Sequence, residues 1–156
     1  MKEIVTFLLS GKEYGVEVSG MQGIENYVPI TPVVDAPECL KGIIIIRDEV
    51  IPVIDIKKHL VLPPAEVTGD TKYLIFNTSY GKMACMADGI SKICRVSGEG
   101  VQDFPPILQT ETTGYVDFIA RNEERLVVVI KPENILTEED WKAINESMAK
   151  VEEEND

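Results

Sequence analysis

Histidine and cysteine are scarce in this chain, and their scarcity excludes several kinds of site. His59 is the only histidine, which rules out any metal site that needs two or more imidazole ligands. The cysteines are Cys39, Cys85 and Cys94, an odd number with none of the paired spacings of zinc sites or redox dithiols. We therefore expect no metal, no cofactor and no disulfide framework, and a protein of the reducing cytoplasm.

Positive charge and long apolar runs are also in short supply. The chain has 156 residues with 15 basic and 27 acidic side chains, a formal net charge of -12. Nucleic acids and anionic membranes attract clustered Lys and Arg, so this balance disfavours both as partners. No run approaches the roughly 18 apolar residues that span a bilayer, and segment 4–9 is too short for a signal-peptide core. We expect a soluble cytoplasmic protein without direct membrane contact.

The acidic end of the chain predicts a single helix. Thr137 precedes three acids, which suits an N-cap followed by a first turn that the helix dipole favours. Apolar residues then recur from Trp141 to Val151 at spacings of three, four and three, which places them on one face. We expect this helix over residues 138–150.

Upstream of that helix, the chain predicts β-structure. Apolar or alternating runs are separated by short turns rich in Gly, Asn, Asp and Ser. Pro52 has no amide hydrogen to donate, so its strand is expected at a sheet edge or with a bulge. Four hairpins are predicted, with strands over 4–9 and 14–18, 42–46 and 50–56, 73–77 and 82–87, and 114–121 and 125–130.

The two halves of the chain repeat the same order of elements. Phe7 with segment 18–24 has a counterpart in Phe76 with segment 87–93, so each half reads as a hairpin, a short helical turn, a loop and a second hairpin. We predict an all-β protein of two pseudo-repeated small barrels plus the C-terminal helix. The expected subdomains cover about 14–71 and 72–135 of one domain, with the N-terminal strand and the helix packing across both.

The residues show no catalytic constellation, which favours a non-catalytic binding module over an enzyme. One alternative is a small β-barrel hydrolase that uses Asp55 or His59 as base and Cys85 or Cys94 as nucleophile. Asp55 and His59 are better explained by the end of a strand and a short turn. Cys85 lies among apolar residues, which favours burial over reactivity.

Segment 42–55 carries a specific pattern. A glycine and an apolar strand lead to Arg47 at a turn, and an Ile-Pro-Val-Ile-Asp strand follows. This pattern resembles the hallmark of the CheW family of chemotaxis coupling proteins. Further segments resemble the family in the same order, namely 13–24, 30–37, 86–90 and 125–136. The resemblance as a whole extends from about residue 4 to 148.

The resemblance implies two five-stranded SH3-like barrels and no catalysis. It implies an adaptor that joins the cytoplasmic tips of chemoreceptors to the regulatory domain of the histidine kinase CheA. Arg47 and Ile93 are the implied receptor-binding residues, in a groove between the barrels. The implied kinase-binding residues lie on the helical turn and neighbouring strands of the first barrel: Met21, Gln22, Gly23, Thr31, Lys41 and Gly42.

Three positions depart from the family pattern. Asp48 stands where a glycine follows the hallmark arginine, although Asp tolerates left-handed backbone better than most residues. Gly23 replaces an acidic or polar residue, and Lys131 replaces the Asp that commonly closes the last strand. The fold should survive these changes. A CheW-like scaffold that has lost kinase binding is therefore the second hypothesis.

Overall fold

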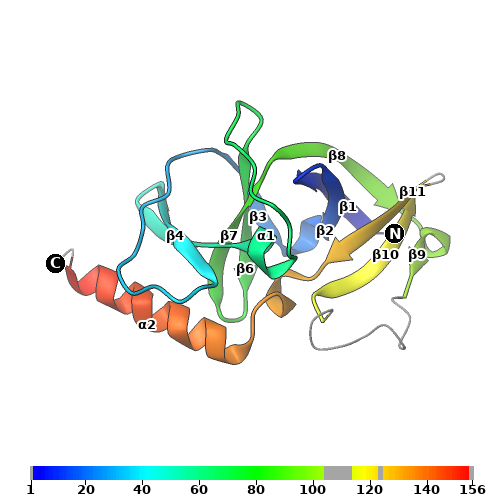
Figure 1. The fold of residues 1–156 in the computed structure, drawn as a ribbon. Coiled ribbons are helices and arrows are strands. Elements are labelled where there is room, and N and C mark those ends of the chain that lie inside the picture. The colour runs from blue at the N-terminus through cyan, green and yellow to red at the C-terminus, as the bar shows by residue number, and fades with distance from the viewer. Residues whose placement is uncertain (1, 104–113, 123–124, 155–156) are drawn as a thin grey trace.

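The computed structural model describes residues 2–103, 114–122 and 125–154, and these form two β-sheets flanked by one long helix (Figure 1). This confirms the all-β prediction. The elements are β1 (Lys2–Leu9), β2 (Lys12–Glu17), η1 (Val18–Gly20), β3 (Met21–Asn26), β4 (Leu40–Ile46), β5 (Glu49–Ile54), α1 (Ile56–His59), β6 (Lys72–Thr78), β7 (Gly81–Ala87), β8 (Gly89–Val96), η2 (Gly98–Gly100), β9 (Val101–Gln102), β10 (Val116–Asn122), β11 (Arg125–Ile130), η5 (Pro132–Asn134) and α2 (Glu138–Glu154).

The five-stranded sheet, in the order β3-β6-β7-β5-β4, forms the first barrel. Its two edges are joined by the chain that leaves β3, because Thr31 forms a bridge with Ile43 of β4. Each of these two residues donates its amide hydrogen to the carbonyl oxygen of the other at 2.9 Å. The Tyr73 hydroxyl holds the same connection by donating to the Val28 carbonyl oxygen at 2.5 Å. The chain that leaves β3 thus reaches the opposite edge of the sheet and closes it at this bridge.

The six-stranded sheet, in the order β8-β1-β2-β11-β10-β9, forms the second barrel. Strand β8 leads through η2 directly to β9 at the opposite edge, so the chain closes this sheet as well. The family resemblance implied five strands here, and the two-residue β9 is the additional one.

The strands are not divided between the barrels at residue 71. Strands β1 and β2 belong to the second barrel, whereas β6 and β7 belong to the first. The expected subdomains over 14–71 and 72–135 therefore need correction, because each barrel takes a hairpin from the other half of the chain. Such an exchange is invisible in the order of hairpins along a sequence.

Alternating side chains divide the interior into three apolar cores. Ile4 points into the second barrel, whereas its neighbour Val5 lies in a core between the barrels. Ile75 likewise fills the first barrel, and Leu74 and Phe76 on either side of it face the space between. We call the cluster between the barrels the junction core. Its large side chains that are at most 2% exposed are Phe7, Leu9, Ile54, Leu74, Phe76, Met83, Ile130, Ile135, Trp141 and Ile144.

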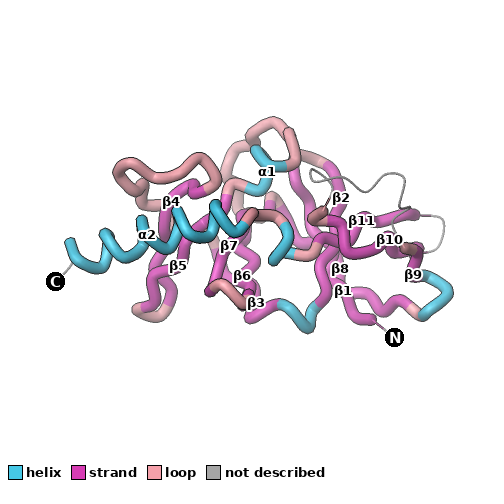
Figure 2. The backbone as a smooth tube through the Cα atoms, turned by 90° about the horizontal axis from the view of Figure 1, so that it is seen from below, coloured by secondary structure: helices cyan, strands magenta, loops and turns pink. Residues whose placement is uncertain are grey.

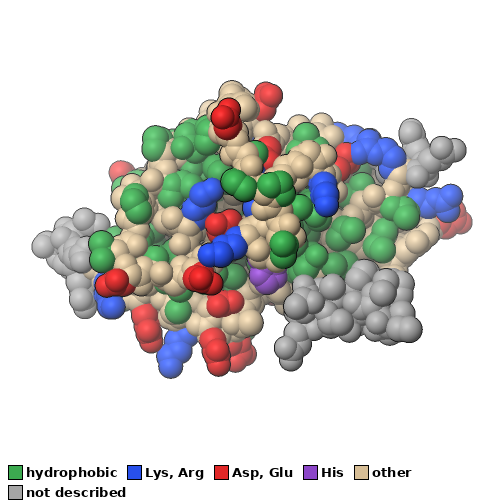
Figure 3. Space-filling view, in the orientation of Figure 1, with side chains coloured by type: hydrophobic (Ala, Val, Ile, Leu, Met, Phe, Trp, Pro, Cys, Tyr) green, Lys and Arg blue, Asp and Glu red, His purple; other side chains and the backbone are tan. Residues whose placement is uncertain are grey.

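Helix α2 begins with a reciprocal cap. The Asp140 amide donates to Thr137 Oγ1 at 3.1 Å, and the Thr137 amide donates to Asp140 Oδ2 at 3.1 Å. Trp141 and Ile144 are fully buried in the junction core, as the apolar spacing predicted. Both views place the helix along the outside of the first barrel (Figures 1 and 2), and acidic side chains follow the lower edge of the molecule where it runs (Figure 3).

Two local expectations are wrong. The helical turn expected over 18–24 is confined to η1, and Met21–Asn26 forms the strand β3. Pro52 lies on β5 between β4 and β7, so the expected sheet edge is wrong. The alternative, a bulge, has support in the register shift of the β4–β5 pairing between Leu40 and Gly42, opposite Ile54 and Val53. Ile43, the partner of Pro52, directs both its amide hydrogen and its carbonyl oxygen toward Thr31. The β4–β5 pairing therefore requires no amide hydrogen from Pro52. Pairing with β7 begins only at Val53.

Candidate interaction surfaces

The predicted kinase-binding residues form two groups on the first barrel. Met21, Gln22 and Gly23 lie on β3, with Gln22 exposed and the other two partly covered. Thr31 and Lys41 are exposed beside β4, which is the opposite end of the sheet in strand order. The bridge that closes the barrel brings these two ends of the sheet onto one body.

Gly42 differs from the other five because it is buried rather than exposed. A Cβ at this position would overlap the Ile30 side chain and lie 2.5 Å from the Thr31 carbonyl oxygen. Its φ of +157° is also uncommon for residues with side chains. Gly42 therefore permits the close approach that closes the first barrel, and it offers no side-chain surface of its own.

The hallmark arginine lies at the β4–β5 turn and reaches across to β3. Arg47 Nη1 is 2.7 Å from Glu25 Oε1, while 76% of the arginine side chain stays exposed. The two residues border a groove of about 290 Å³ whose lining also includes Gln22 and Gly23. The structure thus places the predicted receptor residue Arg47 beside part of the predicted kinase surface. Glu25 was missed from the sequence, because the exposed and partly covered residues that alternate along β3 show no apolar pattern that would mark it.

Left-handed backbone forms the β4–β5 turn. Arg47 has a φ of +49° and Asp48 a φ of +65°, as the two central residues of a tight hairpin of this type require. Asp48 therefore fills the position of the family glycine without abolishing the turn. Gly23 lies on an open part of β3, where a Cβ would meet nothing within 4 Å.

Ile93 lies on the second barrel and does not meet Arg47 in one groove. It is 63% exposed on β8, where it pairs with Val5 of β1. The hollow between the barrels has a volume of about 340 Å³ and is lined by residues that sequence reasoning did not select: Glu17, Ser19, Gly20, Phe76, Asn77, Thr78, Asp117, Ile130, Lys131, Pro132 and Glu133.

The hollow between the barrels is polar at one side. Burial and the nearby Glu17 carboxylate raise the pKa of Asp117 above its usual value, and Lys131 and Lys2 oppose that shift. Lys131, the third departure from the family pattern, thus supplies a positive charge at this hollow.

The structure separates the groups of the hydrolase hypothesis. Cys85 is fully buried in the junction core, and burial raises its pKa to about 12, so its thiol stays protonated at neutral pH. Cys94 packs against the core of the second barrel instead. Asp55 caps α1 by accepting the Lys58 amide at 3.2 Å, and His59 packs against the Tyr115 ring edge.

Within residues 2–103, 114–122 and 125–154, no three His, Cys, Asp or Glu side chains are arranged to hold a metal ion. No helix among these residues combines the length and the hydrophobicity needed to cross a bilayer.

Comparison with known proteins assigns the architecture to a family. Residues 3–140 match the family model described as the CheW-like domain. The chain belongs to this family. The CheW-like match covers both barrels and the first three residues of α2, so it includes every predicted contact residue.

Individual CheW proteins are similar along nearly the whole chain. A chemotaxis protein CheW of Bacillus subtilis is 28% identical over 138 residues, which cover 88% of this chain and 88% of the relative. One from Klebsiella aerogenes is 24% identical over 149 residues, with 96% and 89% coverage. The crystal structure of the scaffolding protein TtCheW from Thermoanaerobacter tengcongensis has a TM-score of 0.78 at 25% identity and covers 89% of this chain and 90% of that one. Family and fold together support a chemotaxis scaffold or adaptor.

Proposed function

We propose that the protein is a non-catalytic cytoplasmic adaptor that couples the cytoplasmic tips of chemoreceptors to the regulatory domain of the histidine kinase CheA. The observation that carries the proposal is the CheW-like match across two closed barrels that share one junction core. A body of this kind holds contact residues on both barrels in a constant relation. Coupling then follows from binding both partners at once.

The kinase contact is assigned to five exposed or partly covered residues on both sides of the closure of the first barrel, namely Met21, Gln22, Gly23, Thr31 and Lys41. Gly42 acts there as a positioning residue, since its buried backbone brings Thr31 against β4. The receptor contact is assigned to Arg47 and Ile93. Arginine is enriched at the centres of interfaces, and a 63% exposed isoleucine is a ready apolar contact.

Binding measurements with the isolated partners test the function directly. The chain should bind the CheA regulatory domain and a soluble receptor-tip fragment, and a mixture of all three should form one complex in size-exclusion chromatography. Binding to the receptor fragment alone would favour the scaffold that has lost kinase binding. Binding to neither partner would contradict the adaptor function.

Replacing Arg47 by alanine should weaken receptor binding by about 1–3 kcal/mol, the range of an interface hot spot. Stability should change by less than about 1 kcal/mol, because an exposed ion pair such as Arg47–Glu25 contributes little. Calorimetric titration with the receptor fragment and urea unfolding measure the two quantities. Arg125→Ala is the matched control, since Arg125 also forms an ion pair on a strand, with Glu13. Equal receptor affinity of Arg47→Ala and the parent would remove Arg47 from the contact.

Adding a side chain at Gly23 probes the kinase surface without disturbing the fold. Gly23→Tyr should reduce kinase affinity at least about tenfold, since the new ring would stand in the assigned contact. Its folding stability should be preserved, because a Cβ there meets no atom within 4 Å and tyrosine suits a strand. Gly98→Tyr, on an equally open glycine of the second barrel, should leave kinase affinity unchanged. If the two variants bind the kinase equally well, the surface is assigned wrongly.

A further inference from the structure

Asp88 occupies the point where the chain crosses from one barrel to the other. It is the single residue between β7 of the first barrel and β8 of the second. Its amide donates to the Leu8 carbonyl oxygen at 2.9 Å, so its backbone is fixed to β1. The carboxylate is therefore held at the boundary between the two bodies.

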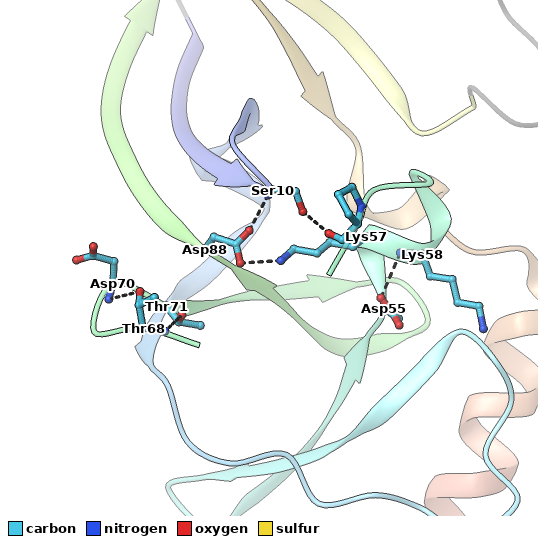
Figure 4. Close-up of polar contacts among 9 residues, drawn as sticks. Ser10, Asp55, Lys57, Lys58, Thr68, Asp70, Thr71 and Asp88 are labelled. Carbon is cyan, nitrogen blue, oxygen red and sulfur yellow. Dashed lines mark hydrogen bonds and ion pairs between the residues drawn. The ribbon is translucent and has the colours of Figure 1, made fainter. Parts of the chain in front are cut away.

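The Asp88 carboxylate binds one group from each barrel (Figure 4). Oδ1 is 2.7 Å from Lys57 Nζ of α1, which follows β5 of the first barrel. Oδ2 accepts the Ser10 amide of the β1–β2 turn of the second barrel at 2.6 Å. The side chains of Lys57 and Asp88 are only 9% and 18% exposed, so this ion pair is largely withdrawn from water.

Both partners of Asp88 are anchored in turn. The Lys57 carbonyl oxygen accepts the Leu62 amide at 2.8 Å, where the chain leaves α1. The Ser10 hydroxyl donates to the Pro63 carbonyl oxygen. Ser10 itself has a φ of +51°, in the left-handed region that tight hairpin turns use. The β1–β2 turn of the second barrel is thus bonded to the segment that follows α1 of the first barrel as well as to Asp88.

We propose that Lys57 and Asp88 are positioning residues that set the orientation of the two barrels and thereby the position of Ile93 on the second barrel relative to the contact residues on the first. The junction core alone is a weak determinant of orientation, because apolar burial is non-directional. A buried ion pair with fixed partners selects one arrangement out of several that bury similar apolar area. The claim about the contact residues rests on the proposed adaptor function, whereas the claim that the ion pair sets the orientation of the barrels does not.

The distance between two spin labels, measured by pulsed electron paramagnetic resonance, tests the orientation of the two barrels directly. The labels are attached at Ile45→Cys on β4 and Leu126→Cys on β11, two exposed strand positions on different barrels. Cys39 and Cys94 are replaced by alanine, and the buried Cys85 is left in place. The parent should give one narrow distance distribution. Lys57→Met combined with Asp88→Asn should give a broader or shifted one, while circular dichroism shows that both barrels remain folded.

Two further variants separate orientation from general damage. Lys57→Arg keeps a cation opposite Asp88 and should retain the parental distances. Arg95→Met combined with Glu3→Gln removes an ion pair that lies wholly within the second barrel, and it should also retain them. Parental distances in the Lys57→Met, Asp88→Asn variant would overturn the proposal, as would altered distances in the Arg95→Met, Glu3→Gln control.

Binding and coupling measurements complete the test. The Lys57→Met, Asp88→Asn variant should bind the kinase domain alone within about twofold of the parent, because the assigned kinase contact lies on the first barrel only. Receptor binding and receptor-dependent kinase activity should each fall at least about fivefold, because Arg47 and Ile93 lie on different barrels. Altered distances with unchanged coupling would overturn the positioning role. If the parent binds neither partner, the adaptor function fails, and the distance measurement alone decides whether the ion pair sets the orientation.

Discussion

Trp141→Ala is expected to lower the free energy of unfolding by about 3–5 kcal/mol, the usual effect of deleting a large aromatic side chain from a core. Trp141 is 1% exposed and joins the start of α2 to the junction core. Its ring also stacks on Tyr80 at the tip of the β6–β7 hairpin, with the ring centroids 5.5 Å apart. Because single domains are stable by only about 5–15 kcal/mol, urea unfolding should detect this loss readily.

Two milder variants make the explanation specific. Trp141→Phe should lose less than half as much, since it keeps a ring in the core and removes an indole Nε1 that has no hydrogen-bond partner among the described residues. Tyr80→Ala should lose about 1 kcal/mol, because this ring is 42% exposed. Equal stability of Trp141→Ala and the parent would show that α2 is not an integral part of the fold.

The sequence was sufficient for the hairpins and the helix because both have strong local signals. The strand pairs β4–β5, β6–β7 and β10–β11 are separated by short turns, and their apolar runs are continuous or alternating. Helix α2 has a cap and an apolar face. In each case, the residues that decide the element lie within a few positions of one another.

Strands β3 and β8 were missed because their side chains carry little apolar signal. In β3, exposed and partly covered residues alternate without any buried one. In β8, only the first and last residues are buried. Both strands are held by backbone pairing with a distant partner, β6 and β1 respectively. The exchange of hairpins between barrels has the same origin, since it depends on pairings that span most of the chain.

The candidate surface was predictable in part for a similar reason. Arg47 was selected because the family resemblance implies it, and its place at a hairpin turn after an apolar strand predicted only that it is exposed. Its partner Glu25 depends on how the first barrel closes, and Gly42 depends on the approach of Thr31 from eleven positions upstream. Lys57 and Asp88 lie in different parts of the chain and meet only at the boundary of the barrels. No local pattern marks such a pair.

Gly42→Asp is expected to damage the fold first and kinase binding only as a consequence. The new Cβ would overlap Ile30 and the Thr31 carbonyl oxygen, so Thr31 must move away from Ile43. The added side chain would also bring a carboxylate to a buried part of the backbone. Overpacking and burial of a charge together should lower the free energy of unfolding by about 3 kcal/mol or more, as measured by urea unfolding.

Amide hydrogen exchange where the first barrel closes measures the effect of Gly42→Asp on the fold more directly. In the parent, the Thr31 and Ile43 amides should exchange slowly with solvent, because each donates to the other residue's carbonyl oxygen at 2.9 Å. Gly42→Asp should make both exchange fast, whereas Gly23→Asp, on an open part of β3, should leave them protected. Gly42→Ala should act in the same direction as Gly42→Asp with a smaller effect, since it adds the Cβ without the charge. A Gly42→Asp protein that has parental stability and protected amides but no kinase affinity would instead make Gly42 part of the contact surface. Such a variant would lose binding while the first barrel stays closed, which is the effect expected of a surface residue and not of a buried one.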